Sequence, residues 1–310
     1  MISDNFGRPV LNFRVSITQR CNLHCVYCHR EGEERNVDNP VTEMTATEIV
    51  RLVSIAVGLG IEKVKLTGGE PLVRSDVLNV VKGIAELKGL KDLAMTTNGS
   101  LLADEAEALF SCGLKRVNIN IPSLRPETYR RLTGGNLTNV LKGIDAAVSA
   151  GFSPVKLNML VLRGINDGEI ASMIDFASRC GAVLQLIELE PINLDNKFFG
   201  RHHLSLDMVE SELKEKAMDV KTRRNMQNRR IYCLPNVKVE VIKPIENTEF
   251  CAHCTRLRLT SDGKLKPCLM RNDNLTDVLT PLRKGASDEE LAQAFLNAIK
   301  RREPYFKRRE

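Results

Sequence analysis

Six of the nine cysteines fall into two groups of three whose spacing suits metal chemistry. The first trio is Cys21, Cys25 and Cys28 in CNLHCVYC, and the second trio is Cys251, Cys254 and Cys268 in CAHC and KPCL. A four-iron cube usually takes four thiolates, so three thiolates leave one iron open to a small molecule. The two trios therefore predict two [4Fe-4S] clusters, each with an open iron that can bind a ligand.

A zinc site is the competing interpretation for each trio. His24 or His29 could supply a fourth ligand to the first trio, although structural zinc sites usually use paired CxxC or HxxxH arms. His253 could complete a structural zinc knob with the second trio. The remaining cysteines have no ligand spacing, and we expect inert thiols at Cys112, Cys180 and Cys233.

Composition and cysteine usage indicate the class of protein and its cellular compartment. The 310 residues are 43% hydrophobic and 27% charged, which is ordinary for a globular enzyme. An odd number of cysteines in ligand-like spacing argues against a disulfide framework and for a reducing compartment. No apolar run approaches the ~20 residues of a membrane span, and no charged-then-apolar leader opens the chain. We therefore expect a cytoplasmic protein that does not associate with a membrane.

The net charge of +6 raises the question of an anionic partner. The chain has no Trp and only 5% aromatic residues, which argues against a nucleic acid polymer. The basic stretches comprise residues 300–309 and Lys221, Arg223, Arg224, Arg229 and Arg230. A solvated basic face is the expected explanation, and a cationic pocket for a small polyanion is the alternative.

Strands and helices alternate through the first two thirds of the chain. Short apolar segments predict six strands at residues 11–18, 62–67, 92–97, 115–120, 154–160 and 182–189. A glycine precedes each of the last five strands and can cap the preceding helix, as after the predicted helices at 46–58 and 167–180. Such alternation builds a parallel sheet, and either a doubly wound sheet or a barrel would satisfy it.

The pattern changes after about Asp219. RRIYCLP and VKVEVIK predict a hairpin around Pro235 and Asn236, and TRLRLT and KLKPCL predict a second hairpin around residues 261–263. A helix at residues 287–300 closes the chain. We expect two domains, residues 1–218 and residues 219–310, the second being an antiparallel α+β module that carries the second trio.

The chemically interesting segments follow successive strands. The first trio comes after strand one, LTGGEP ends strand two and MTTNG ends strand three, so all three meet where sites form on parallel sheets. Cationic side chains alternate with apolar residues inside the strands, at Arg14, Lys63, Lys65 and Lys156. Cations that point inward are costly without a counter-charge, which indicates an anionic ligand.

The CxxxCxxC loop resembles that of the radical S-adenosylmethionine enzymes. The resemblance implies that the first trio holds a cluster whose open iron is chelated by S-adenosylmethionine, which is cleaved on one-electron reduction to a 5′-deoxyadenosyl radical. It also implies a set of contacts to S-adenosylmethionine: Tyr27, Gly69, Glu70, Thr97, Asn120 and Glu190.

One family within this superfamily matches most of the chain, from about residue 7 to residue 298. FRVSITQRCN, GGEPLVR, VLRGIND and FCAHCTRLRLTSDGKLKPCL resemble the GTP 3′,8-cyclases of molybdenum cofactor biosynthesis. The resemblance implies a partial (β/α)6 TIM-type barrel followed by a C-terminal module with a second [4Fe-4S] cluster. It implies that GTP is converted to 3′,8-cyclo-7,8-dihydro-GTP by radical chemistry, with no side chain assigned a catalytic role beyond the cluster ligands.

The same resemblance implies a substrate cage and partners. GTP would be held by Arg14, Lys65, Lys156, Arg256 and Arg258. The last two are separated by one residue, which places both guanidinium groups on one strand face, where forked cationic donors suit a triphosphate. The implied partners are a low-potential electron donor of flavodoxin or ferredoxin type and cyclic pyranopterin monophosphate synthase, which catalyses the next step. The resemblance leaves open whether the protein is a monomer or a homodimer.

Two departures from the family pattern and two other functions are weighed against this hypothesis. Asn120 stands where Ser is usual, and Gln185 stands where Arg commonly precedes the Ile-Glu pair of strand six. A peptide-modifying radical enzyme with an auxiliary cluster would typically have more than three C-terminal cysteines. A zinc-stabilised nucleotide-binding protein is the non-enzymatic alternative.

Overall fold

The computed structural model describes residues 2–33 and 43–305. Six parallel strands follow one another in chain order across the sheet, each paired with the next. These strands are β1 (Asn12–Ser16), β2 (Lys63–Thr67), β3 (Asp92–Thr97), β4 (Arg116–Asn120), β5 (Val155–Val161) and β6 (Val183–Glu188). All six strands predicted from the sequence are confirmed, with small differences at their ends.

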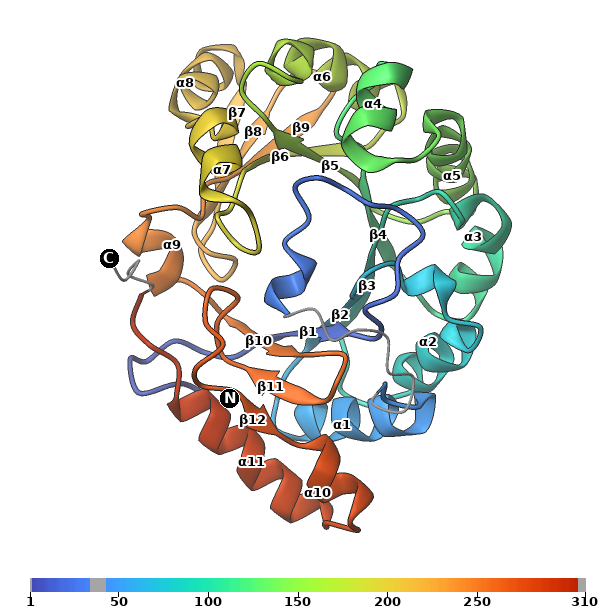
Figure 1. Ribbon diagram of the computed structural model, residues 1–310, viewed down its shortest axis with the longest axis vertical. Coiled ribbons are helices and arrows are strands. Elements are labelled where there is room, and N and C mark those ends of the chain that lie inside the picture. The colour runs from blue at the N-terminus through green and yellow to red at the C-terminus, as the bar shows by residue number, and fades with distance from the viewer. Residues whose placement is uncertain (1, 34–42, 306–310) are drawn as a thin grey trace.

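Helices connect these strands and cover only the outer side of the curved sheet (Figure 1). They are α1 (Ala46–Gly58), α2 (Val77–Ala85), α3 (Leu102–Ser111), α4 (Pro126–Thr133), α5 (Leu137–Ser149) and α6 (Ile170–Arg179). A doubly wound sheet would carry helices on both faces, so the arrangement is that of an open, partial barrel. The predicted α/β fold with a mostly parallel sheet is confirmed.

The C-terminal strands extend this sheet at both of its edges. β9 (Lys238–Ile242) pairs parallel with β6 and is followed outward by β8 (Arg229–Cys233) and β7 (Asp219–Arg223), both antiparallel. At the other edge β10 (Arg256–Leu259) pairs parallel with β1, and β11 (Lys264–Lys266) and β12 (Thr276–Asp277) follow it. Both predicted hairpins are present, but they join one twelve-stranded sheet instead of building a separate one.

In the part of the chain that the structure describes, five further helices follow β6, and three short 3₁₀ turns lie earlier in the chain. They are α7 (Asn196–His202), α8 (Asp207–Lys216), α9 (Thr248–Ala252), α10 (Leu279–Arg283), α11 (Asp288–Lys300) and three 3₁₀ turns, η1 (Arg30–Gly32), η2 (Pro71–Val73) and η3 (Asp167–Glu169). The predicted closing helix is confirmed as α11, which begins at a capping box of Ser287 and Glu290. Within the described residues, none of the helices has the length and apolar character needed to cross a membrane.

Alternation along the strands separates the core from the inside of the barrel. On β1, Phe13 and Val15 are buried in the hydrophobic core, and Phe13 packs on Phe295 of α11 with ring centroids 5.5 Å apart. Arg14 lies between them and lines a cavity instead, in register with Lys65 of β2 and Arg258 of β10. The two-residue period of a strand thus delivers a row of cations to the inner face.

Close packing between α3 and α5 gives a test of this architecture. A Cβ at Gly143 would clash with the backbone carbonyl of Gly99, whereas a Cβ at Gly58 of α1 would meet nothing within 4 Å. We expect Gly143→Ala to lower the free energy of unfolding by about 1–3 kcal/mol, because overpacking shifts the backbone. Gly58→Ala, the matched control, should raise it by up to about 1 kcal/mol. Denaturant unfolding measures both, and a neutral Gly143→Ala would contradict the packing.

Candidate active site

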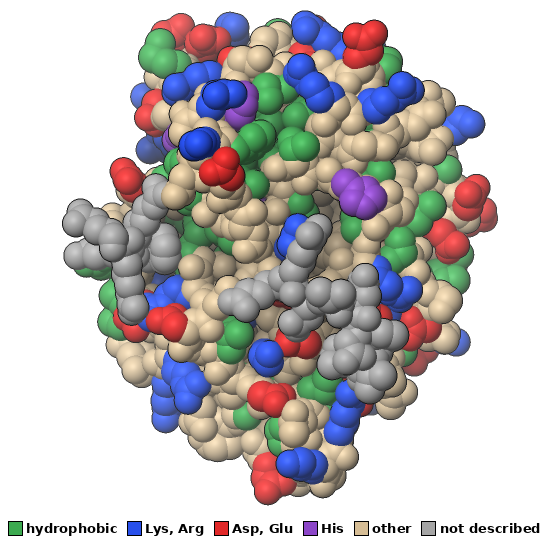
Figure 2. All heavy atoms as spheres, in the orientation of Figure 1, with side chains coloured by type: hydrophobic (Ala, Val, Ile, Leu, Met, Phe, Trp, Pro, Cys, Tyr) green, Lys and Arg blue, Asp and Glu red, His purple; other side chains and the backbone are tan. Residues whose placement is uncertain are grey.

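Both cysteine trios line a single cavity of about 1380 Å³ on the inner side of the sheet. The segment after β1, which carries the first trio, crosses the open centre of the strands in Figure 1. The second trio reaches the same cavity from α9 and from the segment after β11. On this face of the molecule, hydrophobic side chains gather above the centre and charged side chains are interspersed around it (Figure 2). Two loops far apart in sequence therefore share one chamber.

The loop of the first trio is held by main-chain contacts to the end of α4. The N–H of His24 donates to the carbonyl of Thr133 at 2.9 Å, and the N–H of Val26 donates to that of Leu132 at 3.0 Å. Burial raises the pKa of Cys21 and Cys28, and raises that of Cys25 to about 12. Three thiols that resist ionisation become ligands when a metal stabilises the thiolates, so this donor set fits an iron–sulfur cluster.

The second trio lies among arginines. Burial raises the pKa of Cys268. Burial also acts to raise the pKa of Cys254, but the positive charges of Arg302 and Arg256 outweigh it, so that the pKa is lowered. His253 interacts through Nδ1 with the carbonyl of Glu249 at 3.0 Å and is not among the residues that line the cavity. Among the described residues, no three His, Cys, Asp or Glu side chains are placed to hold a single metal ion.

Two glycines bring LTGGEP against the segment that leads into the first trio. The N–H of Gly69 donates to the carbonyl of Thr18 at 2.8 Å, and the N–H of Glu70 donates to that of Arg20 at 2.8 Å. A Cβ at Gly68 or Gly69 would collide with these same backbone oxygens. The segment therefore needs glycine for close approach, and Gly68 and Gly69 both line the cavity.

Glu70 is turned away from the cavity. It is 0% exposed, and its carboxylate accepts hydrogen bonds from the N–H of Leu72, the hydroxyl of Thr97 and the N–H of Asn98. Burial raises its pKa to about 7, against the effect of these three hydrogen bonds. Glu70 therefore joins the ends of β2 and β3 and places Thr97 and Asn98, which do line the cavity.

The other residues expected around S-adenosylmethionine lie together in the cavity wall. Tyr27, Asn120 and Glu190 all line it. Oδ1 of Asn120 accepts a hydrogen bond from Nδ2 of Asn158 at 3.0 Å, and Oε2 of Glu190 lies 4.0 Å from Nε2 of His29. Asn98, in the MTTNG segment at the end of β3, also lines the cavity, and its Nδ2 lies 3.9 Å from Sγ of Cys21.

The five cations expected around GTP all line the cavity, and they differ in how they are neutralised. Arg258 and Arg14 lie 2.7 Å and 3.6 Å from Oε2 of Glu31, and Lys156 lies 2.7 Å from Oε2 of Glu240. Burial would raise the pKa of Glu31, but Arg14 and Arg258 lower it to about 2. Three of the five cations therefore already have a carboxylate partner.

Lys65 and Arg256 have no carboxylate partner among the residues that the structure describes. Lys65 donates to Oδ1 of Asn118 at 2.7 Å, and Arg256 contacts Sδ of Met226 at 3.6 Å. Burial and neighbouring cations hold the pKa of each group well below its ordinary value. An anionic ligand would offset this penalty and favour the charged form of both groups, so this part of the cavity wall is suited to one.

Glu240 organises a second cationic group that sequence reasoning missed. Its buried carboxylate lies 2.7 Å from Lys156, 2.9 Å from Arg223 and 3.8 Å from Arg229, and it also accepts from Gln185. The expected solvated basic face is therefore wrong for Arg223 and Arg229, which line the cavity. It holds for Lys221, Arg224 and Arg230, which are exposed. The sequence feature that could have indicated this group is Glu240 itself, the single acidic residue in the otherwise apolar and basic segment VKVEVIK.

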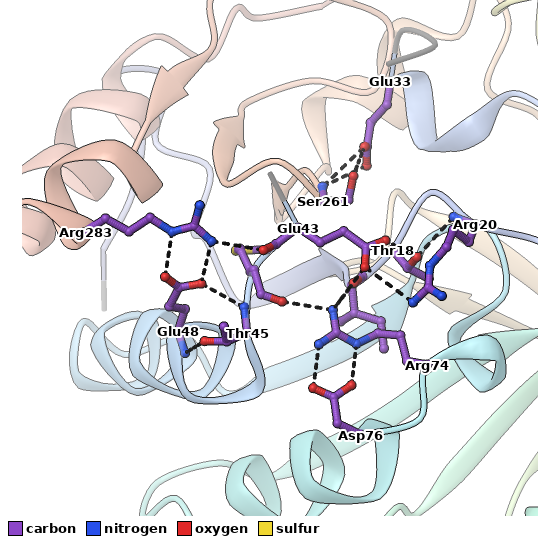
Figure 3. A network of polar contacts seen from close by, with 12 residues as sticks. Thr18, Arg20, Glu33, Glu43, Thr45, Glu48, Arg74, Asp76, Ser261 and Arg283 are labelled. Atoms are coloured by element: carbon purple, nitrogen blue, oxygen red, sulfur yellow. Dashed lines mark hydrogen bonds and ion pairs between the residues drawn. The ribbon is translucent and has the colours of Figure 1, made fainter. Parts of the chain in front are cut away.

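A network on the outer side of β1 fixes the start of the first-trio loop (Figure 3). Arg74 donates to the carbonyls of Ile17 at 2.6 Å and Met44 at 3.0 Å, and its Nε and Nη2 hold both oxygens of Asp76. Glu43 accepts from the hydroxyl of Thr18 and lies 4.0 Å from Arg74. Ile17 and Thr18, which lead into the loop of the first trio, are therefore held in place by side-chain contacts.

Comparison with known proteins places the chain in a class defined by this fold and cysteine loop. Residues 15–177 match the Radical SAM superfamily, and residues 182–308 match Molybdenum Cofactor Synthesis C. Streptococcus suis SuiB bound to S-adenosylmethionine superposes with a TM-score of 0.58 at 17% identity, over 84% of this chain and 58% of SuiB. The protein anSMEcpe with bound AdoMet gives 0.60 at 14% identity, over 92% of this chain and 81% of that protein.

The full-length relatives narrow the class. The chain is 51% identical to a "Probable GTP 3′,8-cyclase" of Thermococcus kodakarensis, over 99% of this chain and all of the relative. It is 44% identical to a protein of the same name from Methanocaldococcus jannaschii, over 99% of both chains. The chain therefore belongs to the GTP 3′,8-cyclase family of the radical SAM superfamily, and it is an enzyme that uses S-adenosylmethionine and an iron–sulfur cluster.

The Glu240 cluster gives a stability prediction. Glu240→Gln leaves Lys156, Arg223 and Arg229 without their carboxylate, so we expect a loss of about 3–5 kcal/mol in the free energy of unfolding at pH 7. The three cations hold the pKa of Glu240 well below its ordinary value, against the effect of burial. Its stabilising contribution is therefore complete above the unfolded carboxyl pKa and is lost as the pH falls through the folded-state value.

Denaturant unfolding as a function of pH checks this prediction. The difference between wild type and Glu240→Gln should be constant near neutral pH and should narrow below about pH 4.5, the ordinary carboxyl value. Glu62→Gln is the matched control, because Glu62 pairs with Lys91 at the surface and should change stability by less than about 1 kcal/mol. Equal effects of the two substitutions would contradict the role given to Glu240.

Proposed function

We propose that the protein converts GTP to 3′,8-cyclo-7,8-dihydro-GTP in the first step of molybdenum cofactor biosynthesis. The observation that carries the proposal is that two thiol trios and two cations without carboxylate partners line the same cavity. One trio suits S-adenosylmethionine and the other suits the substrate, and the cations suit a triphosphate between them. The names of the full-length relatives support the same reaction.

The first trio is proposed to hold the cluster that binds S-adenosylmethionine, and the second trio a second [4Fe-4S] cluster that faces GTP. When bound, the first cluster and S-adenosylmethionine would supply the radical chemistry needed at the ribose 3′ position. The cavity wall formed by Tyr27, Gly69, Thr97, Asn120 and Glu190 is proposed to hold S-adenosylmethionine. Glu70 contributes indirectly, because its carboxylate places Thr97 and Asn98.

GTP is proposed to lie with its phosphates on the cationic wall. Lys65 and Arg256 offer charges that no carboxylate of the described residues neutralises, and Arg14, Arg258 and Lys156 add donors that Glu31 and Glu240 hold in place. These residues bind and orient the nucleotide so that ribose C3′ meets the radical and guanine C8 is in reach for ring closure. Placement in a chamber that excludes water is the chain's contribution, and none of its side chains needs to act as a base.

Further proposals concern the setting of the reaction. A low-potential donor of flavodoxin or ferredoxin type would supply the electron that reduces the first cluster and also the electron that, together with a proton, completes the 7,8-dihydro product after ring closure. Cyclic pyranopterin monophosphate synthase would take the product. An odd number of cysteines in ligand-like spacing supports a reducing, cytoplasmic location. The division into domains at residues 218 and 219 stays a prediction, and a homodimer is an arrangement to test by light scattering.

An anaerobic product assay tests the function. Reconstituted protein with S-adenosylmethionine, GTP and a strong reductant is expected to form 5′-deoxyadenosine and a cyclised nucleotide in equal amounts. Each chain should hold about eight irons if both trios carry a four-iron cluster. A measured content of about four irons per chain would contradict the proposed second cluster. Turnover with a peptide but not with GTP would overturn the proposed substrate.

Substitution of the cations without carboxylate partners tests the substrate cage. We expect Lys65→Met and Arg256→Met each to raise KM for GTP by about 10–100-fold, because a charge-assisted hydrogen bond contributes about 1.5–3 kcal/mol. Lys221→Met is the matched control, since Lys221 is exposed on β7 and pairs with Asp219 at 3.7 Å. Steady-state kinetics with GTP measure the change, and an unchanged KM in both variants would place the phosphates elsewhere.

A further inference from the structure

Segments near the two ends of the chain meet behind the second trio. Arg8 precedes β1 and Arg302 follows α11. Nη1 of Arg8 donates to the carbonyl of Cys251 at 2.9 Å, and Nη2 of Arg302 donates to the carbonyl of Cys254. The CxxC segment of the second trio is therefore held through its main chain by two guanidinium groups from distant parts of the sequence.

Both guanidinium groups converge on the carboxylate of Asp4. Nε of Arg8 lies 2.7 Å and Nη1 of Arg302 lies 3.0 Å from Oδ2 of Asp4. Oδ1 of Asp4 accepts from the N–H groups of Phe6 and Arg8, each at 3.0 Å. The Asp4 side chain is 0% exposed and that of Arg302 is 2% exposed. We call Asp4, Arg8 and Arg302 the terminal clamp.

Arg8 also fastens the segment that carries Arg302. Its Nη1 donates to the carbonyl of Pro304 at 2.9 Å, and its Nη2 donates to that of Glu303 at 2.6 Å. One side chain thus holds residues 303 and 304 and Cys251 together. Removal of Asp4 would release both guanidinium groups at once, because it is the carboxylate that the two arginines share.

The net charge of the terminal clamp suits the loop that carries Cys251 and Cys254. Two guanidinium groups against one carboxylate leave one positive charge behind a loop whose thiols bind metal as thiolates. Main-chain contacts to the carbonyls of Cys251 and Cys254 fix the backbone from which two of the three sulfur atoms project. Outer contacts that orient metal ligands are typically worth about 10–100-fold in metal affinity.

We propose that the terminal clamp positions the second trio for its cluster, with Asp4 as the residue that orients both arginines. The inference rests on the proposed second cluster and goes beyond it, since it gives residues 4–8 and 302–304 a role in a site formed by residues 251–268. The clamp acts on the cluster site only and leaves the first trio, which is held by contacts to Leu132 and Thr133, unaffected.

Asp4→Asn tests the clamp, because it removes the charge with little change of shape. In anaerobically reconstituted full-length protein, we expect iron to fall about twofold, from about eight to about four per chain. Electron paramagnetic resonance of the reduced protein should retain the signal that S-adenosylmethionine perturbs and lose the signal that GTP perturbs. Asp288→Asn is the matched control, since Asp288 pairs with Arg51 at the surface and should leave iron and both signals unchanged.

Arg302→Lys is the second variant and guards against misfolding of Asp4→Asn. It keeps the charge but loses the fork that reaches both Asp4 and the carbonyl of Cys254, so the GTP-perturbed signal should again weaken selectively. Wild-type iron and both signals in the two variants would overturn the clamp, as would equal loss of both signals. A wild-type chain that binds four irons would instead overturn the proposed second cluster itself, and the clamp's role with it.

Discussion

Burial of positive charge inside the barrel is the constraint on which the rest of the site depends. Cations on β1, β2, β5 and β10 face one cavity, where desolvation penalises each of them. Two buried carboxylates make this arrangement possible: Glu31 pairs with Arg14 and Arg258, and Glu240 pairs with Lys156, Arg223 and Arg229. An anionic substrate would supply the counter-charge that no carboxylate of the described residues gives to Lys65 and Arg256.

Glu31 and Glu33 connect the segment after the first trio to the hairpin that carries Cys268. Glu31 lies three residues beyond Cys28, yet it accepts from Arg258 on the strand that follows Cys254 and from the hydroxyl of Thr67. Glu33 then accepts from the N–H and hydroxyl of Ser261, in the turn between β10 and β11 that leads to Cys268 (Figure 3). Side chains next to the first thiol trio are therefore bound to the hairpin that carries Cys268, so the contacts that balance the cations also hold the two thiol trios relative to each other.

Local patterns were sufficient to predict the strands, α1 and both C-terminal hairpins, because each is specified by periodicity, capping and turn residues close in sequence. The parallel pairing of β9 with β6 and of β10 with β1 was not predictable in the same way, since no local signal states which edge a hairpin joins. Gly69 was recognisable as a close-approach glycine. The Glu70 carboxylate turns away from the cavity to accept from the N–H of Asn98, 28 residues further along the chain. Arg229 turns toward the cavity and pairs with Glu240. Neither contact has a local signal in the sequence.

The edge pairings explain why the C-terminal strands share one sheet with the barrel strands. An open sheet of six parallel strands would expose unpaired N–H and C=O groups at β1 and β6, which is unfavourable for a soluble edge. The C-terminal strands satisfy both edges, and the strand that pairs with β1 follows directly after the CxxC of the second trio. Backbone pairing that completes the sheet therefore also delivers the second trio to the cavity. If β10 were detached, β1 would lose its edge partner, and the cavity would lose Arg256 and Arg258. Completion of the sheet and the cationic wall proposed for GTP therefore depend on the same backbone hydrogen bonds.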